Sequence, residues 1–111
     1  MTVTARPLVT AQYAPNAETT VYTAPASTRT IIDKCTGYNG TGGAVTLAIK
    51  IVPNAGAAGA SNQVVSKSLA AGETYTFPEV VGHVLETGGF VSVLAGAATS
   101  VVIRMSGREV S

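Results

Sequence analysis

The chain has 111 residues and a net charge of +1, and it is 46% hydrophobic but only 12% charged. A length of this order suits one domain, which can bury a core without metals or disulfides. The basic residues are scattered and form no run or aromatic-interleaved patch, so we expect no nucleic-acid partner. No stretch of about 18 apolar residues occurs, so we expect no transmembrane helix and no membrane partner.

The charged share is about half of the usual value, which has two explanations. Other subunits could cover part of the surface, or the chain could be a small β protein coated with Thr and Ser. The single cysteine, Cys35, excludes an internal disulfide and fits synthesis in a reducing compartment. The chain opens without a charged and then apolar leader, so we expect no signal peptide.

Residues 1–18 are predicted to form an extended N-terminal arm, separate from a single domain at residues 19–111. The segment contains two prolines, shows no clean periodicity and carries the isolated apolar residues Leu8, Val9 and Tyr13. Such a stretch cannot build its own core. It is therefore either an arm that becomes ordered against a partner or a frayed terminus.

The first predicted strands follow at residues 19–23 and 28–38, which are rich in β-branched side chains. Ile31 and Ile32 are adjacent, so they must face opposite sides of the second strand. A kink, or burial on both faces, would resolve this conflict. Asn39-Gly40 comes next and is the preferred dipeptide of tight hairpins, so we expect a hairpin there.

The stretch 43–53 has the clearest strand pattern and is predicted to be a central strand of an antiparallel sheet. Alternate residues are apolar, which indicates one buried face. These residues are Val45, Leu47, Ile49 and Ile51. Glycines before the stretch and Pro53 after it set its ends.

The second half of the chain continues with strands predicted at residues 62–69, 74–77, 90–94 and 99–106. Residues 79–89 could hold a short strand or a single helical turn. The total is about seven or eight strands separated by turn signals every 8 to 12 residues or so, with no amphipathic helix. The predicted fold is an all-β antiparallel sandwich or jelly roll.

Residues that could perform chemistry are few. His83 is the only histidine, so no pair of imidazoles can bind a metal, and a surface or loop position is the simpler reading. Cys35 reads as a buried thiol that acts as a small apolar side chain. The conceivable carboxylate pairs are Glu79 with Glu86 and Asp33 with Glu73, but a hydrolytic pair needs a set separation and a cleft. We therefore predict no enzyme, no metal and no cofactor.

The order of several pieces between residues 21 and 109 resembles a known group of proteins. The pieces are Tyr22-Thr-Ala-Pro-Ala-Ser-Thr-Arg29, an Ala-Val-Thr-Leu-Ala-Ile strand that ends in Val52-Pro53, Leu69-Ala-Ala-Gly-Glu-Thr74, Val84-Leu-Glu-Thr-Gly-Gly89 and Ser106-Gly-Arg-Glu109. This order resembles small β-sandwich virion structural proteins of tailed bacteriophages and prophages, which are head decoration or cement proteins and small tail- or neck-associated proteins.

The resemblance implies a non-enzymatic protein, made in the host bacterial cytoplasm, that becomes part of the virion. The implied partners are the major capsid protein or other virion proteins and further copies of the chain, as a trimer or dimer. Sheet edges, the arm and apolar side chains would make the contacts. The candidate partner-binding residues are Leu8, Val9, Tyr13, Tyr22 and Tyr38.

A second hypothesis is a carbohydrate-binding β-sandwich, such as a receptor-binding protein associated with a phage tail or fibre. Tyrosine rings can stack on sugars, and the chain has four of them but no tryptophan. In this hypothesis the loops around Tyr38 and residues 54–62 would form the sugar site.

Overall fold

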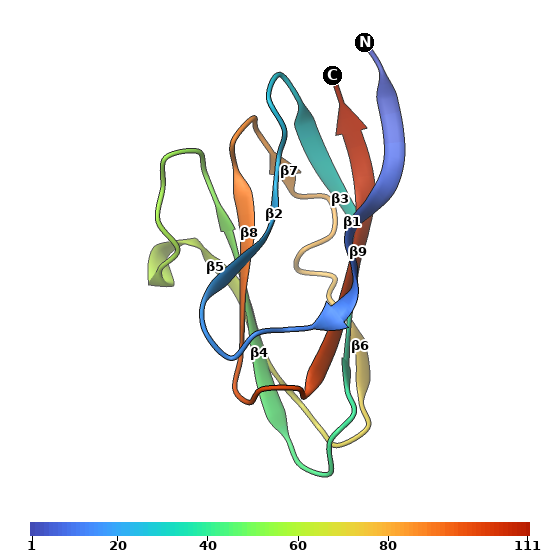
Figure 1. Cartoon of the computed structure of the whole chain (residues 1–111), viewed down its shortest axis with the longest axis vertical. Helices are drawn as coiled ribbons and strands as arrows, with labels where there is room; N and C mark the ends of the chain where they lie inside the picture. Colours follow the sequence, from blue (N-terminus) through green and yellow to red (C-terminus); the bar gives the residue numbers. More distant parts are fainter.

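Nine strands form two antiparallel sheets that stack as a sandwich (Figure 1). The computed structural model describes every residue from 1 to 111. The predicted all-β sandwich or jelly roll is confirmed, with nine strands where seven or eight were expected. The strands are β1 (Val3–Tyr13), β2 (Thr19–Thr23), β3 (Arg29–Asn39), β4 (Val45–Val52), β5 (Gln63–Leu69), β6 (Thr74–Thr76), β7 (Val84–Leu85), β8 (Phe90–Ala95) and β9 (Val101–Val110).

We call the two layers sheet A and sheet B. Sheet A has the order β1-β9-β3-β6, with β7 also paired to β3, and sheet B has the order β2-β8-β4-β5. The chain passes repeatedly from one sheet to the other, as in a jelly roll. The only helix is a 3₁₀ turn at Ala60–Asn62, and no helix reaches the length and apolar character that crossing a membrane requires.

The core lies between the sheets, and β4 contributes to it as predicted. This strand lies between β8 and β5, and Leu47 and Ile49 are fully buried. Their neighbours Ala48 and Lys50 are also buried, although they point away from the core. The alternation predicted one buried face, but both faces of β4 are covered at these positions.

The segment expected to be a separate arm belongs to the sandwich. Residues 3–13 form β1, which pairs with β9, and Leu8 and Val9 are only 7% and 2% exposed because they join the core. The pairing shifts register between Pro7 and Val9 and again between Val9 and Gln12. These irregularities remove the alternation by which a strand is recognised in a sequence.

The hairpin predicted at Asn39-Gly40 is wrong, because the two flanking strands lie in different sheets. β3 belongs to sheet A and β4 to sheet B, so the loop crosses from one layer to the other. The fully buried Asn39 side chain fixes this crossing by donating hydrogen bonds to the carbonyls of Gly43 (2.8 Å), Leu69 (2.9 Å) and Ala70 (3.3 Å). The side chain thus serves as a buried cap, whereas the prediction assigned the residue to a tight turn.

The adjacent isoleucines of β3 face opposite sides, with Ile32 in the core and Ile31 half-buried on the outer face, and the predicted kink follows them. The pairing with β9 shifts register between Ile32 and Lys34. Opposite this kink the backbone of Gly107 lies so close to β3 that a Cβ atom there would be 2.2 Å from the carbonyl oxygen of Ile31. Only glycine fits at position 107, where the two paired strands approach each other so closely. Residues 79–89 hold the short strand β7, which was one of the two expectations for that segment.

Candidate interaction face

The five predicted partner-binding residues lie in three different environments. Leu8 and Val9 are core residues, so their side chains are already used within the chain. Tyr22 is half-buried between the sheets and belongs to a polar network. Tyr13 and Tyr38 are 54% and 44% exposed. Only these last two are free to contact another molecule.

Tyr22 connects sheet B to sheet A. Its hydroxyl donates to the carboxylate of Glu109 in β9 and also bonds to the hydroxyl of Thr30 in β3 at 2.7 Å. Arg6 in β1 pairs with the other oxygen of Glu109 at 3.0 Å. Burial, followed by the hydrogen bond to Glu109, raises the pKa of Tyr22 to about 12. We call this group the polar bridge, and its role is structural.

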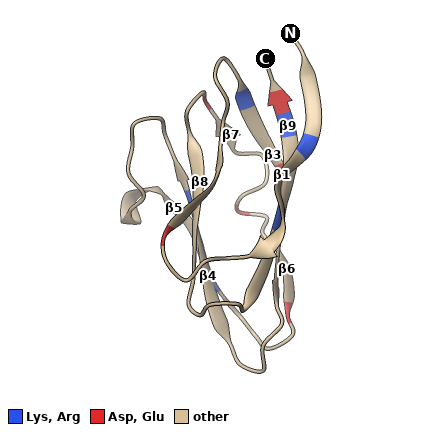
Figure 2. Cartoon of the chain, viewed as in Figure 1, with Lys and Arg blue, Asp and Glu red and all other residues tan.

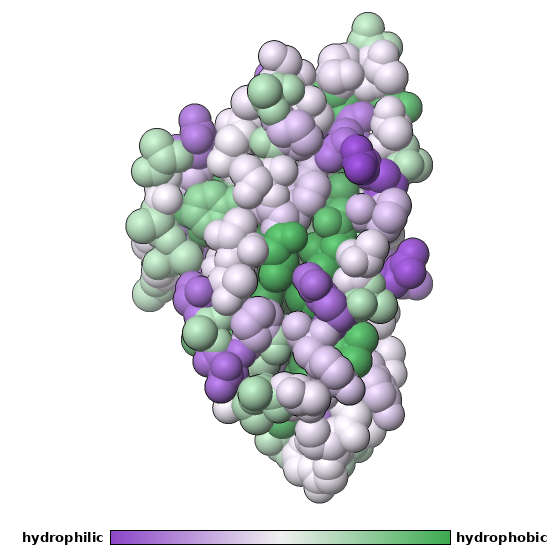
Figure 3. Space-filling view, in the orientation of Figure 1, coloured by the Kyte–Doolittle hydropathy of each residue, from purple (hydrophilic) through white to green (hydrophobic).

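The polar bridge spans the seam where the edge strands β1 and β2 of the two sheets face each other without pairing (Figure 1). In the same orientation, Figure 3 shows apolar side chains at the surface along this seam. Hydrogen bonds between side chains therefore join the layers at this opening, where a paired strand is absent.

Tyr13 and Tyr38 lie on the outer face of sheet A. Tyr13 is paired with Val102 of β9, which is in turn paired with Tyr38 of β3, so the three side chains form a row across the sheet. The ring of Tyr38 covers the backbone of Gly40, where a Cβ would lie 3.1 Å from the ring. This contact holds the Tyr38 ring against the sheet end.

Positive charge accumulates on the same sheet. Its strands carry five basic and two acidic residues, a net charge of +3, and Figure 2 shows the basic positions on β1, β3 and β9. Lys34 and Arg104 are exposed on the outer face and have no carboxylate partner. Arg104 lies two residues along β9 from Val102, on the same side of the strand. We call Tyr13, Lys34, Tyr38, Val102 and Arg104 the tyrosine face.

All six carboxylates of the side chains are already engaged within the chain. Four are in ion pairs, namely Arg6–Glu109 (3.0 Å), Arg29–Glu86 (2.8 Å), Arg108–Asp33 (3.0 Å) and Lys50–Glu18. The other two accept hydrogen bonds, Glu73 from the backbone N–H of Ala70 (2.7 Å) and Glu79 from the hydroxyl of Tyr75 (3.0 Å). The carboxylates considered as hydrolytic pairs, Glu79 with Glu86 and Asp33 with Glu73, are therefore not partners of each other, because each bonds to a different group.

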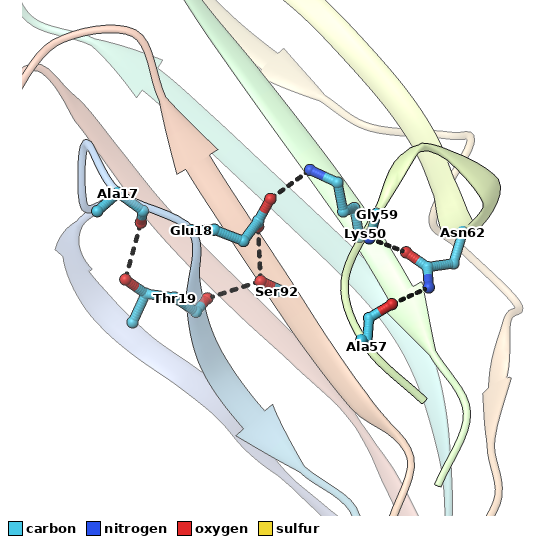
Figure 4. Close-up of polar contacts among 8 residues, drawn as sticks. All are labelled: Ala17, Glu18, Thr19, Lys50, Ala57, Gly59, Asn62 and Ser92. Atoms are coloured by element: carbon cyan, nitrogen blue, oxygen red, sulfur yellow. Dashed lines mark hydrogen bonds and ion pairs between the residues drawn. The ribbon is translucent and has the colours of Figure 1, made fainter. Parts of the chain in front are cut away.

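One of these ion pairs covers the outer side of sheet B (Figure 4). Lys50 is 6% exposed and its ammonium contacts the carboxylate of Glu18, which also accepts a hydrogen bond from Ser92 at 2.6 Å. Burial alone would raise the pKa of Glu18, but the hydrogen bonds from Lys50 and Ser92 and the charge of Lys50 together lower it. The carboxylate therefore stays ionised beside the lysine.

The free edges of both sheets are poorly suited to pairing with another strand. β1 contains Pro7 and two register shifts, β2 has five residues and one shift, and β6 and β7 have three and two residues. The seven-residue β5 carries Lys67 on its core-facing side, with the ammonium 4.9 Å from the centre of the Tyr75 ring. Prolines, bulges and inward-pointing lysines are known devices against edge pairing.

Two residues that could have been reactive lie where the sequence indicated. His83 is exposed in the loop before β7. Cys35 is 2% exposed, and burial raises the pKa of its thiol to about 12. No group of three or more His, Cys, Asp or Glu side chains could hold a metal.

The structure has one pocket, about 210 Å³ in volume, between the end of β4 and β7. It is lined by Ile51, Val52, Pro53, Asn54, Val84, Leu85, Glu86 and Gly89. The only ionisable lining group, Glu86, is paired with Arg29. The pocket therefore offers apolar walls without a free charge.

The loops proposed for sugar binding do not come together. Tyr38 lies at the end of the sandwich where β4 begins, next to the crossing loop at Asn39. Residues 54–62 follow the other end of β4, eight residues later. A strand of that length spans about 26 Å, which separates the two regions.

Comparisons with known proteins support the fold only. No protein-family model and no curated protein matches the chain. A chain of the Bacillus endospore appendages, described as a novel family of disulfide-linked pili, shares 16% identity with a TM-score of 0.52, covering 99% of this chain and 88% of its own length. A chain of infectious bursal disease virus, Gx strain, shares 12% identity with a TM-score of 0.48, and this protein spans only 31% of it.

Proposed function

We propose that this protein is a non-enzymatic structural component of a bacteriophage virion, a capsid decoration or cement protein that binds and stabilises the head lattice. The tyrosine face carries this proposal, because it presents aromatic and basic side chains together on the outer face of sheet A. Tyrosine and arginine are enriched at protein–protein contacts. The resemblance of residues 21–109 to virion proteins is the reason for proposing a virion as the assembly that the protein joins.

The shape of the molecule supports a role in attachment. A β-sandwich holds its exposed side chains on rigid strands, so little conformational entropy is lost when they bind. The similar chain from the endospore appendages belongs to a pilus, which is also a protein assembly. That pilus is disulfide-linked, whereas the single cysteine here, Cys35, is buried, so attachment by this chain would not use a disulfide.

Mass spectrometry of purified virions, with the copy number per particle, tests the proposal. On the order of hundreds of copies would place the protein on the shell, as expected for a decoration protein that follows lattice symmetry. A handful of copies would place it at the tail or neck. Absence from the particles would contradict a virion role altogether.

The proposal includes self-association as a trimer or dimer that matches the symmetry of the lattice. Because the sheet edges are poorly suited to pairing with another strand, the contacts between copies would use faces of the sandwich. Light scattering coupled to size-exclusion chromatography measures the mass of the purified protein. A mass of one chain at all concentrations would argue against this part of the proposal.

A tail- or fibre-associated carbohydrate-binding protein is the second candidate. The specific observation in its favour is that two exposed tyrosines share one face with an arginine, an arrangement on which sugar rings can stack. Titration with the surface polysaccharide of the host would show saturable binding in this case. Flat titration curves would remove this candidate.

A further inference from the structure

We propose that the tyrosine face docks onto an acidic patch of a different virion protein and not onto a second copy of this chain. This inference rests on the proposed role in a virion and adds the surface and the chemistry of the partner. It starts from the row of Tyr13, Val102 and Tyr38, with Lys34 and Arg104 beside it.

The apolar part of the face has the properties of a binding centre. Both tyrosines lie on strands of one sheet, and the Tyr38 ring already rests on Gly40. The Tyr38 ring is therefore positioned before any partner arrives, which lowers the entropic cost of binding. Val102, half-buried between them, gives the row a continuous apolar surface.

The charged part of the face defines the chemistry of the partner. Of the seven basic residues, Arg6, Arg29, Lys50 and Arg108 are neutralised by carboxylates. Lys67 lies on β5, over the ring of Tyr75. Only Lys34 and Arg104 are exposed, have no carboxylate partner and lie on the same face as the tyrosines. A partner with carboxylates opposite these two cations would be complementary in charge.

A second copy of the chain meets this requirement poorly. Four of its six acidic side chains are already neutralised by cations within the chain. The other two, Glu73 and Glu79, each accept a single hydrogen bond and lie close to β6. They are the only acidic side chains without a cation that a copy could offer to Lys34 and Arg104. A separate protein with an acidic patch therefore fits the tyrosine face better than a second copy.

Competition on particles tests the inference. Wild-type protein and the double variant Lys34→Glu/Arg104→Glu are produced together during particle assembly, and mass spectrometry counts each on purified particles. We expect the variant to be depleted about tenfold or more relative to wild type, because repulsion replaces attraction at two contacts. Equal occupancy would overturn the inference while leaving the virion role intact.

The matched control is Lys67→Glu, which changes a cation that lies outside the tyrosine face. It should compete like wild type. A loss equal to that of the double variant would mean that net charge decides attachment and would overturn the inference. Thermal unfolding should be similar for wild type and the double variant, because Lys34 and Arg104 are exposed. The same measurement checks that Lys67→Glu, which loses its contact with the Tyr75 ring, is still folded.

A second measurement tests whether the tyrosine face binds acidic groups, even if the protein is absent from particles. NMR of the labelled protein is followed during titration with poly-L-glutamate and, separately, with alginate, an acidic polysaccharide. Shifts with polyglutamate at Tyr13, Tyr38, Val102 and Arg104, lost in the double variant and weakened about tenfold in Tyr38→Ala, would support the inference. Shifts elsewhere, no shifts, or shifts with alginate alone would overturn it, and the last outcome would favour the carbohydrate candidate.

Discussion

Asn39 uses its side chain in five hydrogen bonds, which tie the loop between β3 and β4 to the loop after β5. We expect Asn39→Ala to lower the free energy of unfolding by about 3 kcal/mol, because the buried carbonyl of Leu69 and the partly buried carbonyls of Gly43 and Ala70 would lose their donor. Urea unfolding measures the change. The exposed Asn16 provides the control, and Asn16→Ala should change the free energy by less than about 0.5 kcal/mol. Equal effects of the two substitutions would contradict the capping role.

Cys35 is a residue whose burial controls its reactivity. With its pKa raised to about 12, the thiol stays protonated at neutral pH and is also shielded from reagents. We expect no reaction with Ellman's reagent at pH 8 in the folded protein and stoichiometric reaction in concentrated urea. Rapid labelling of the folded protein would show that β3 opens readily at this position.

At the scale of elements, the contact between β3 and β9 depends on the absence of a side chain at Gly107. We expect Gly107→Ala to cost at least about 3 kcal/mol or to prevent folding, because the new methyl would collide with the backbone of Ile31. Gly43→Ala is the matched control, since a Cβ there meets no atom within 4 Å. Circular dichroism and urea unfolding of the two variants should differ sharply. Similar stabilities would mean that β9 can move aside.

The polar bridge joins the edge strand β2 to sheet A. Removal of the Tyr22 hydroxyl in Tyr22→Phe leaves buried oxygens of Glu109 and Thr30 with one partner fewer, so we expect a loss of about 1–3 kcal/mol. Tyr38→Phe removes a hydroxyl that has no partner within the chain and should be nearly neutral. Thermal unfolding compares the two. A neutral Tyr22→Phe would show that the bridge does not hold the seam closed.

For the whole molecule, the ion pair of Glu18 with Lys50 predicts how stability changes with acid. The pKa of Glu18 is lowered on folding, so its contribution is complete above the unfolded value of about 4.5 and is lost as the pH falls through the lower folded value. The stability gap between wild type and Glu18→Gln should therefore shrink between pH 6 and pH 3. Urea unfolding across this range measures the gap, and a constant gap would contradict the prediction.

Much of the fold could be predicted because local patterns carry it. From residue 19 onward each predicted strand has a counterpart, and the period-two pattern of β4 correctly identified Leu47 and Ile49 as core. β1 was missed because its register shifts remove the alternation. The hairpin at Asn39 was wrong because the same dipeptide is compatible with a crossing between sheets, which depends on distant carbonyls.

The tyrosine face could be predicted only in part. Tyr13 and Tyr38 were candidates from their residue type alone, but 25 positions separate them in the chain. They lie on either side of Val102 because both pair with this residue of β9, and such a register between distant strands leaves no local signature. The unpaired state of Lys34 and Arg104 was also hidden, because it depends on where every carboxylate finds its partner.

The pairing of β1 with β9 also determines when this protein can fold. The first strand completes sheet A only by binding the last one, so a growing chain on the ribosome cannot close the sandwich until residues 101–110 have emerged. Contacts between such distant segments are slow to form because a long loop must be closed first. Until then Leu8 and Val9 remain exposed to solvent, and truncation before β9 would leave a chain prone to aggregation.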